Sequence, residues 1–323
     1  MFAKLIVPLD NSPLAEQALP TAEALAQRTG GEIELVYVHE PRAFAGYADA
    51  PWNAARRSLE DSYICAMADE TRAGSGVPVH GGIATGRPAD AICARARQTR
   101  ADLIVMTSHG RTGLSRAWLG SVADSVIRQA AIPVLLLRPQ ASISRAKLRP
   151  AFARVLVPLD GSAVSELILG PAAALAAANG GRLILLEIVR PVPLMVPDAA
   201  LAYSAMSSVA DPEATQKAML HATSHVLATA RRLAANGITN VETHVVVNDA
   251  PAQAIIDATR VQAADIVAMT TSGAGTSRVV VGSVADKVMR AVQLPLLLYR
   301  PNAIELDEAH FGLATQVLQP SMI

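Results

Sequence analysis

The ten residues AKLIVPLDNS, from Ala3 to Ser12, recur as ARVLVPLDGS from Ala153 to Ser162, 150 positions farther along a chain of 323 residues. Each copy is a short aliphatic run followed by an aspartate and a serine. Such a run, bounded by turn-forming residues, is typical of a strand buried on both faces. Because an internal repeat marks a repeated structural unit, we expect the chain to contain two copies of one domain.

The repeat continues to the end of each copy, with small changes in spacing. Three further segments recur: ADLIVMTSHG (101–110) as ADIVAMTTSG (264–273), GSVAD (120–124 and 282–286), and PVLLLRP (133–139) as PLLLYRP (295–301). The distance between matching residues rises from 150 to 163 at the first of these segments, so the second copy has gained 13 residues. It then falls to 162 at the other two, so the second copy has lost one residue between Gly273 and Gly282. We therefore predict domains at 1–140 (the first half) and 152–301 (the second half), followed by a tail at 302–323.

Each copy alternates short apolar strands with helical patterns. In the first copy the expected strands are LIVPL, EIELVYV, VPVHGGI, DLIVMT and VLLLR, and the expected helices cover Ser12 to Arg28, Asn53 to Ala73, Pro88 to Arg100, and a segment from Gly120. Ser12 is suited to begin the first helix, and Gly30 to end it. This alternation predicts an α/β fold with two tandem doubly wound parallel five-stranded sheets, each in the strand order 3-2-1-4-5.

Composition narrows the classes of function. Lys plus Arg and Asp plus Glu both number 28, so a formal net charge of zero gives no electrostatic reason to expect nucleic acid or a membrane as partner. Two cysteines, Cys65 and Cys93, do not make a disulfide framework. The sequence shows neither a signal peptide nor a long apolar span, so we expect a cytoplasmic protein.

Polar residues follow strands one and four, where the predicted strand order reverses. Strand one ends in Asp10-Asn11-Ser12 and Asp160-Gly161-Ser162, and strand four runs into TSHGRTGLSRAWLGS in the first copy. Ligands of doubly wound sheets bind at this switch point, at the carboxyl ends of the strands. The segment is rich in small residues and ends at Gly120-Ser121, an expected helix N-terminus whose free amides favour phosphate.

Several of these residues have a second interpretation. Asp10 could accept a hydrogen bond from a ribose hydroxyl or a base amine, or it could cap a helix beside Ser12. His109 could donate to a phosphate or lie in a surface loop. His221 and His225 are spaced for a metal pair on a helix, but the sequence offers no third ligand, which favours a solvated helix face. We therefore assign no metal ligand and no catalytic residue.

The segments VPLDNS and MTSHGRTGLSRAWLGSVADSVIRQAAIPVLLLRP resemble the universal stress protein family. The ATP-binding branch of that family has a motif of Gly, two residues, Gly, nine residues, Gly, then Ser or Thr. The first copy has Thr107 in place of the first glycine and then matches at Gly110 and Gly120-Ser121. The second copy has Thr270 at that place, and only eight residues separate Gly273 from Gly282-Ser283.

The resemblance implies an adenine nucleotide alpha hydrolase-like fold and a set of nucleotide-binding residues in each copy. For adenine and ribose it implies Pro8, Leu9, Asp10 and Val38, and for phosphate Gly110, Gly120, Ser121 and Val122. The matching second-copy residues are Pro158, Leu159, Asp160, Ile188, Gly273, Gly282, Ser283 and Val284. We add Ser12, Thr107, His109, Arg111 and Gly113 as neighbours in the same turns. The expected ligand is ATP, or AMP or ADP, with Mg²⁺ as companion to ATP.

Three classes of function stay open. The first, which we favour, is a stress-response regulator that binds an adenine nucleotide, chiefly in its first half, with slow or no hydrolysis. The second is an ATP-cleaving enzyme, although the Ser-Gly-Gly loop of ATP pyrophosphatases is absent from Asp10-Asn11-Ser12. The third is a protein-interaction module of the same fold that binds no nucleotide. Strand five is apolar and lies at the predicted sheet edge, so we expect the halves to pair through it, with a homodimer as a further possibility.

Overall fold

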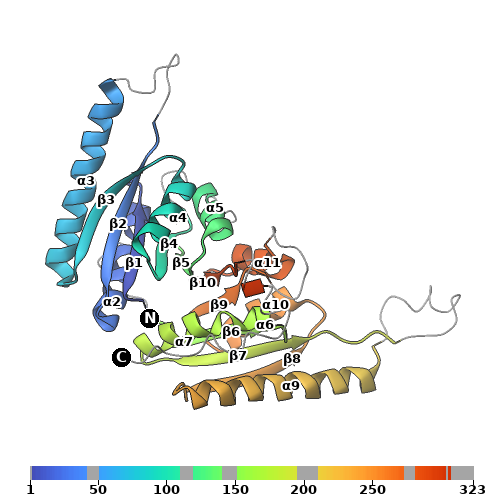
Figure 1. The fold of residues 1–323 in the computed structure, drawn as a ribbon. Coiled ribbons are helices and arrows are strands. Elements are labelled where there is room, and N and C mark those ends of the chain that lie inside the picture. The colour runs from blue at the N-terminus through green and yellow to red at the C-terminus, as the bar shows by residue number, and fades with distance from the viewer. Residues whose placement is uncertain are drawn as a thin grey trace, which may run out of the picture.

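A computed structural model describes residues 2–41, 51–109, 119–139, 151–194, 210–272, 281–302 and 305–306. Two α/β halves share a single ten-stranded sheet (Figure 1). The strands of the first half are β1 (Lys4–Leu9), β2 (Glu32–His39), β3 (Val79–Thr85), β4 (Leu103–Thr107) and β5 (Val134–Leu137). Those of the second half are β6 (Arg154–Leu159), β7 (Arg182–Val189), β8 (Val241–Val247), β9 (Ile266–Thr270) and β10 (Leu296–Tyr299).

The sheet runs in the order β3-β2-β1-β4-β5-β10-β9-β6-β7-β8. Each half therefore has the predicted order 3-2-1-4-5, and all pairs within a half are parallel. The two five-stranded units do not stay separate, because β10 pairs antiparallel with β5 and aligns Leu296 with Leu136 and Leu297 with Leu135. The prediction of two parallel sheets thus describes each half correctly, while the whole chain forms one mixed sheet.

Helices cover both faces of this sheet. The first half contributes α1 (Pro13–Glu16), α2 (Leu19–Thr29), α3 (Pro51–Ser75), α4 (Pro88–Thr99) and α5 (Ser121–Gln129). The second half contributes α6 (Ala163–Glu166), α7 (Leu169–Ala178), α9 (Pro212–Ala235), α10 (Pro251–Val261) and α11 (Ser283–Ala291). Within the described ranges, no helix is both long enough and apolar enough to cross a membrane.

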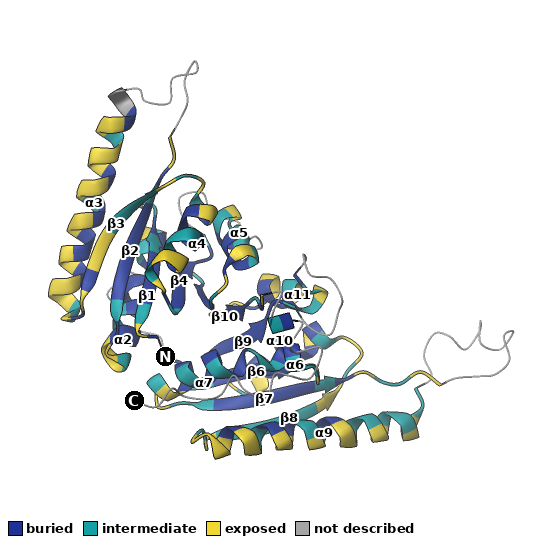
Figure 2. Ribbon diagram, in the orientation of Figure 1, coloured by how far each residue is buried: buried dark blue, intermediate teal, exposed yellow. Residues whose placement is uncertain are grey.

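The core has two layers, one on each face of the sheet. Figure 2 shows that the central strands between these layers are largely buried. Successive side chains of a strand point to opposite faces, so Leu5 and Val7 join the layer with α2 and α3, while Ile6 joins the layer with α4 and α5. Because both faces are covered, the central strands of the first half, β1, β4 and β5, are apolar at nearly every position, as their sequences predict.

The first helix of each half is interrupted, which corrects one prediction. Instead of one helix from Ser12 to Arg28, the chain forms α1, breaks near Gln17, and resumes as α2. Pro20 is the reason, because it has no backbone N–H for the carbonyl four residues earlier and its ring would clash there. The expected cap is confirmed: the Ser12 hydroxyl accepts a hydrogen bond from the Ala15 N–H at 3.2 Å.

Candidate functional site

The carboxyl ends of β1 and β4 lie side by side at the point where the strand order reverses. β1 pairs with β2 on one side and with β4 on the other, aligning Leu5 with Leu103. In the second half, β6 pairs with β7 and β9 in the same way. The turn after strand one and the segment after strand four therefore begin next to each other in each half, at the place where doubly wound sheets bind ligands.

The turn after β1 fixes the Asp10 carboxylate. Its Oδ1 accepts hydrogen bonds from the Ser12 N–H at 3.1 Å and from the Ser12 hydroxyl at 2.6 Å. Asn11 between them has a φ of 62°, a left-handed conformation that asparagine tolerates better than most residues. Ser12 itself is buried and serves as a helix cap. The helix-capping role expected for Ser12 is thus confirmed. The same residue holds the Asp10 carboxylate at the end of the strand in a defined orientation.

The second half repeats this turn. Asp160 Oδ1 accepts from the N–H and the hydroxyl of Ser162, and the Ser162 hydroxyl accepts from the Ser165 N–H at 3.2 Å. Gly161 takes the place of Asn11 with a φ of 78°. The carboxylates of Asp10 and Asp160 are therefore equivalent in position and support.

Strand alternation separates the expected adenine-side residues. Pro8 is on the face of the sheet that carries α4 and α5, and Val38 packs against the core layer of that face. Val122 of α5, which was expected on the phosphate side, packs against the same layer. Leu9 is 4% exposed and packs in the opposite layer, so only its backbone could face a ligand there. Ile188, Val284 and Leu159 take the corresponding places in the second half.

The segment after strand four is closed at its base by one backbone hydrogen bond in each half. The Gly120 N–H donates to the Ser108 carbonyl at 2.8 Å, and the Gly282 N–H donates to the Thr271 carbonyl at 2.7 Å. These bonds hold the start of α5 against the end of β4, and the start of α11 against the end of β9. Gly110, Arg111, Gly113 and Gly273 lie outside the described residues.

Thr107 replaces the first glycine of the expected motif, and it has a structural partner. Its hydroxyl donates to the His109 carbonyl at 2.9 Å, and Thr270 makes the same contact with the Ser272 carbonyl. Both threonines are buried. The threonine therefore ties the first residues of the segment together, a role that its presence in both copies could have signalled. His109 is half-buried, with Nδ1 at 3.0 Å from the Ser108 hydroxyl.

α5 and α11 begin with glycine caps that supply no capping side chain. Gly120 and Gly282 are the N-cap residues, followed by exposed Ser121 and Ser283. The first N–H groups of a helix carry partial positive charge and need acceptors from elsewhere, which makes such an end suited to phosphate. A Cβ at position 120 would stand 2.8 Å from the Ser108 carbonyl oxygen, so the close approach at this helix start requires glycine.

The carboxylate one turn into each of these helices is already engaged. Both oxygens of Asp124 accept from Arg128, at 2.8 and 3.1 Å, and both oxygens of Asp286 accept from Arg290, at 2.8 and 3.0 Å. The bonds from Arg290 outweigh the effect of burial and lower the pKa of Asp286. Both carboxylates are therefore members of ion pairs within their own helices.

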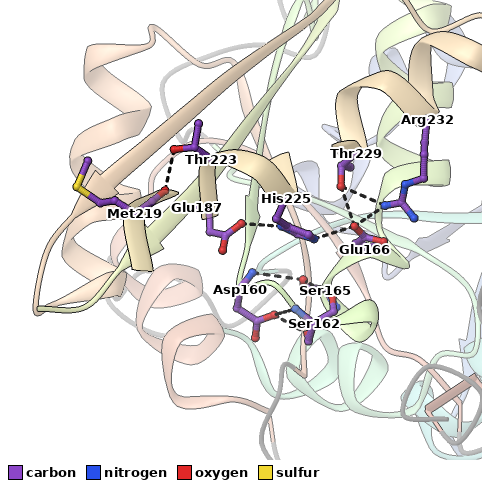
Figure 3. A network of polar contacts seen from close by, with 10 residues as sticks. All are labelled: Asp160, Ser162, Ser165, Glu166, Glu187, Met219, Thr223, His225, Thr229 and Arg232. Atoms are coloured by element: carbon purple, nitrogen blue, oxygen red, sulfur yellow. Dashed lines mark hydrogen bonds and ion pairs between the residues drawn. The ribbon is translucent and has the colours of Figure 1, made fainter. Parts of the chain in front are cut away.

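The histidine pair on α9 behaves differently at its two positions. His221 is exposed, as expected for a solvated helix face. The same expectation is wrong for His225, which is half-buried between the carboxylates of Glu187 and Glu166 (Figure 3). Helical spacing could not reveal these contacts, because β7 and α6 bring the two carboxylates from distant parts of the sequence. The described residues contain no group of three or more side chains arranged to hold a metal ion.

Comparison with known proteins agrees with this architecture. The universal stress protein family matches residues 1–138 and again 151–300. A universal stress protein of Methanocaldococcus jannaschii, MJ0531, is 33% identical over 145 residues, which cover 43% of this chain and 83% of the relative. The solved structure of an Archaeoglobus fulgidus universal stress protein covers 93% of this chain and 97% of its own, with 19% identity and a TM-score of 0.65.

Another solved member of the family is in complex with cAMP; it covers 42% of this chain and 98% of its own, with 22% identity and a TM-score of 0.31. The family match extends over both halves and nearly the whole described sheet. The chain is therefore a tandem member of the universal stress protein family.

Proposed function

We propose that the first half binds an adenine nucleotide, ATP or else AMP or ADP, and that the protein is a stress-response regulator with slow or no hydrolysis. The observation that carries this proposal is the start of α5. Its glycine-capped N-terminus is held against the end of β4 by the bond from Gly120 to Ser108, beside the fixed carboxylate of Asp10. A nucleotide needs both an anion site and an acceptor for its ribose, and this arrangement supplies the two together.

The neighbouring residues suit the remaining parts of the ligand. Val38 is half-buried on the face of the sheet that carries α4 and α5, and it offers apolar surface for a base. The Ser121 hydroxyl is exposed at the first helical position and could donate to a phosphate. Mg²⁺ would enter with ATP, carried by its phosphates.

The contacts of the nearby carboxylates support slow or absent hydrolysis. Fast phosphoryl transfer needs a group that positions the nucleophile and carboxylates that hold the metal ion. Asp124 gives both oxygens to Arg128, and Asp10 gives Oδ1 to Ser12. We place the protein in the cytoplasm, where adenine nucleotides are available and where the free thiols of Cys65 and Cys93 stay reduced.

The test is to identify small molecules released from the purified protein by mass spectrometry, and then to titrate the emptied protein with ATP, ADP and AMP, with and without Mg²⁺. We expect micromolar or tighter binding of at least one of them, and ATP turnover below about one per second, the lower end for kinases. No binding of any adenine nucleotide would support the protein-interaction module instead. Faster turnover would support the ATP-cleaving enzyme.

We also predict that the second half binds nucleotide more weakly than the first. Its segment after strand four is one residue shorter, and Ser272 and Ala274 replace His109 and Arg111. Exposed Asp249, at the position of Gly86, adds negative charge near the end of β8. Losing two charge-assisted bonds would cost roughly 3–6 kcal/mol, which is more than a hundredfold in affinity. Crystals soaked at increasing ATP concentrations should show the first half filled before the second; equal occupancy of the two halves at every concentration would contradict this.

A further inference from the structure

The imidazole of His225 lies between two carboxylates from different elements. Its Nδ1 is 2.7 Å from Glu187 Oε2 on β7, and its Nε2 is 3.0 Å from Glu166 Oε1 on α6 (Figure 3). The three side chains are 21%, 10% and 17% exposed, respectively. Both ring nitrogens of His225 are therefore within hydrogen-bonding distance of carboxylate oxygens.

Other groups around the imidazole complete the network. Glu166 Oε1 also accepts from the Thr229 hydroxyl at 2.8 Å and from the Arg232 guanidinium, both on α9. Burial alone would raise the pKa of Glu166, but the bonds from Arg232 and Thr229 and the nearby positive charges together lower it. On β8, Val245 is aligned with Glu187 and adds no charge on that face. Glu166 therefore stays ionised well into the acidic range.

Only one protonation state of His225 satisfies this geometry. The imidazolium form donates from both nitrogens, one to each carboxylate. A neutral imidazole has a single N–H, so it would donate to one carboxylate and turn a lone pair toward the other. Histidine is the side chain that ordinarily changes charge between about pH 5 and pH 8. The contact is therefore complete only while His225 is protonated, and it loses one bond when the imidazole gives up a proton.

The network is joined to the turn after β6. α6 has only four residues, and it carries both Ser165 and Glu166. The Ser165 hydroxyl accepts from the Asp160 N–H at 3.3 Å, while the next residue contacts His225. Glu187 also lies under this turn, with Oε1 3.4 Å from the place that a Cβ of Gly161 would occupy. Weakening the contacts of His225 would therefore loosen the support of the turn that presents Asp160.

In the first half, tyrosines make the contact that corresponds to the His225 network. The Tyr63 hydroxyl on α3 donates to Glu16 Oε1 at 2.9 Å, and Tyr37 on β2 packs edge-to-face on Tyr63 with ring centroids 6.1 Å apart. Glu16 and Tyr37 are the repeat counterparts of Glu166 and Glu187. Burial, followed by the bond to Glu16, raises the pKa of Tyr63 far above neutrality. This contact does not change charge in the physiological range.

We propose that the second half contains a pH-sensitive clamp, in which protonated His225 binds Glu166 and Glu187 and so holds α9 to the turn that carries Asp160. The clamp is complete while His225 is protonated and weakens when the imidazole loses its proton, whereas the equivalent contact of the first half has no histidine and keeps its charge state. This proposal concerns the protein without ligand, so it stands or falls independently of nucleotide binding.

Hydrogen exchange of the full, nucleotide-free chain tests it, with each amide referred to its intrinsic exchange rate. Between about pH 5.5 and about pH 8.5, protection at residues 160–167 should fall by roughly tenfold, as expected for the loss of one charge-assisted bond. Protection at residues 10–17, the same turn of the first half, should not change. Nitrogen-15 spectra of the imidazoles should show both His225 nitrogens protonated at the lower pH.

The decisive variant is Glu187→Tyr with His225→Tyr, which rebuilds the first half's arrangement in the second. We expect its turn at 160–167 to lose the pH response. His225→Gln, which cannot change charge, gives the same test if the double variant does not fold. A pH response that persists in the folded variant would overturn the proposal, as would equal responses of the two turns in the unmodified protein.

Discussion

Replacing both Leu136 and Leu297 with aspartate is expected to separate the two halves of the chain. Both leucines are 0% exposed and lie in β5 and β10, the strands that join the halves into one sheet. Burying an unpaired charge at such a position costs several kcal/mol, and this cost falls when the halves separate and the two edge strands meet water. We call the β5–β10 pair the joint between the halves. The residues paired with Leu136 and Leu297 at this joint are Leu296 and Leu135, so neither aspartate would meet a compensating cation there.

The measurement uses the protein expressed as two chains, residues 1–140 and 151–323. Unmodified halves should elute together in size-exclusion chromatography, and the two-aspartate variant should elute as separate halves that keep their helical circular dichroism. Leu59→Asp is the matched control, because Leu59 is 73% exposed on α3. Co-elution of folded variant halves would show that another surface holds them together.

Two reciprocal arginines also cross this joint. Arg138 after β5 donates to the Met289 carbonyl at the end of α11, and Arg300 after β10 donates to the Arg128 carbonyl at the end of α5. A guanidinium near a helix C-terminus complements the partial negative charge there. The Arg138 guanidinium lies in a partly desolvated site, and this burial lowers its pKa. Arg138 of the first half thus contacts the C-terminal end of α11, whose N-terminal end belongs to the candidate site of the second half. Arg300 of the second half makes the same kind of contact with α5, which begins at the candidate site of the first half.

Much of the fold was predictable because it depends on local patterns. Runs such as LIVPL and LIVMT are apolar at successive positions, which is typical of strands covered on both faces, and the repeat made each assignment twice. The break between α1 and α2 was missed, because apolar residues at helical spacing continue through Pro20 and conceal its effect on the hydrogen-bond ladder.

The candidate site was predictable in its location and less so in its details. Strand order alone placed Asp10 and Gly120 at the switch point. The partners of individual side chains were not predictable, because they come from distant segments. His225 meets Glu187, which is 38 residues away, and Glu166, which is 59 residues away. No periodicity along α9 contains that information.

The last prediction concerns the two cap glycines, which form a matched pair. A Cβ at Gly120 would stand 2.8 Å from the Ser108 carbonyl oxygen, whereas a Cβ at Gly282 would stand 3.5 Å from the Thr271 carbonyl oxygen. The first distance is a clash with backbone, and the second is an ordinary contact. Gly120→Ala must therefore push the start of α5 away from β4 and strain the hydrogen bond from Gly120 to Ser108. Gly282→Ala leaves the equivalent bond of the second half intact.

We expect Gly120→Ala to abolish most of the ATP binding of the first half, and Gly282→Ala to leave it unchanged. Moving the helix start redirects several N–H groups at once, and hydrogen bonds weaken steeply with misalignment. The loss of two charge-assisted bonds of about 1.5–3 kcal/mol each would reduce affinity more than a hundredfold. Calorimetric titration measures the affinity, and thermal unfolding checks that both variants stay folded at the temperature used. Equal ATP affinity in the two variants would mean that the phosphates do not lie at the start of α5.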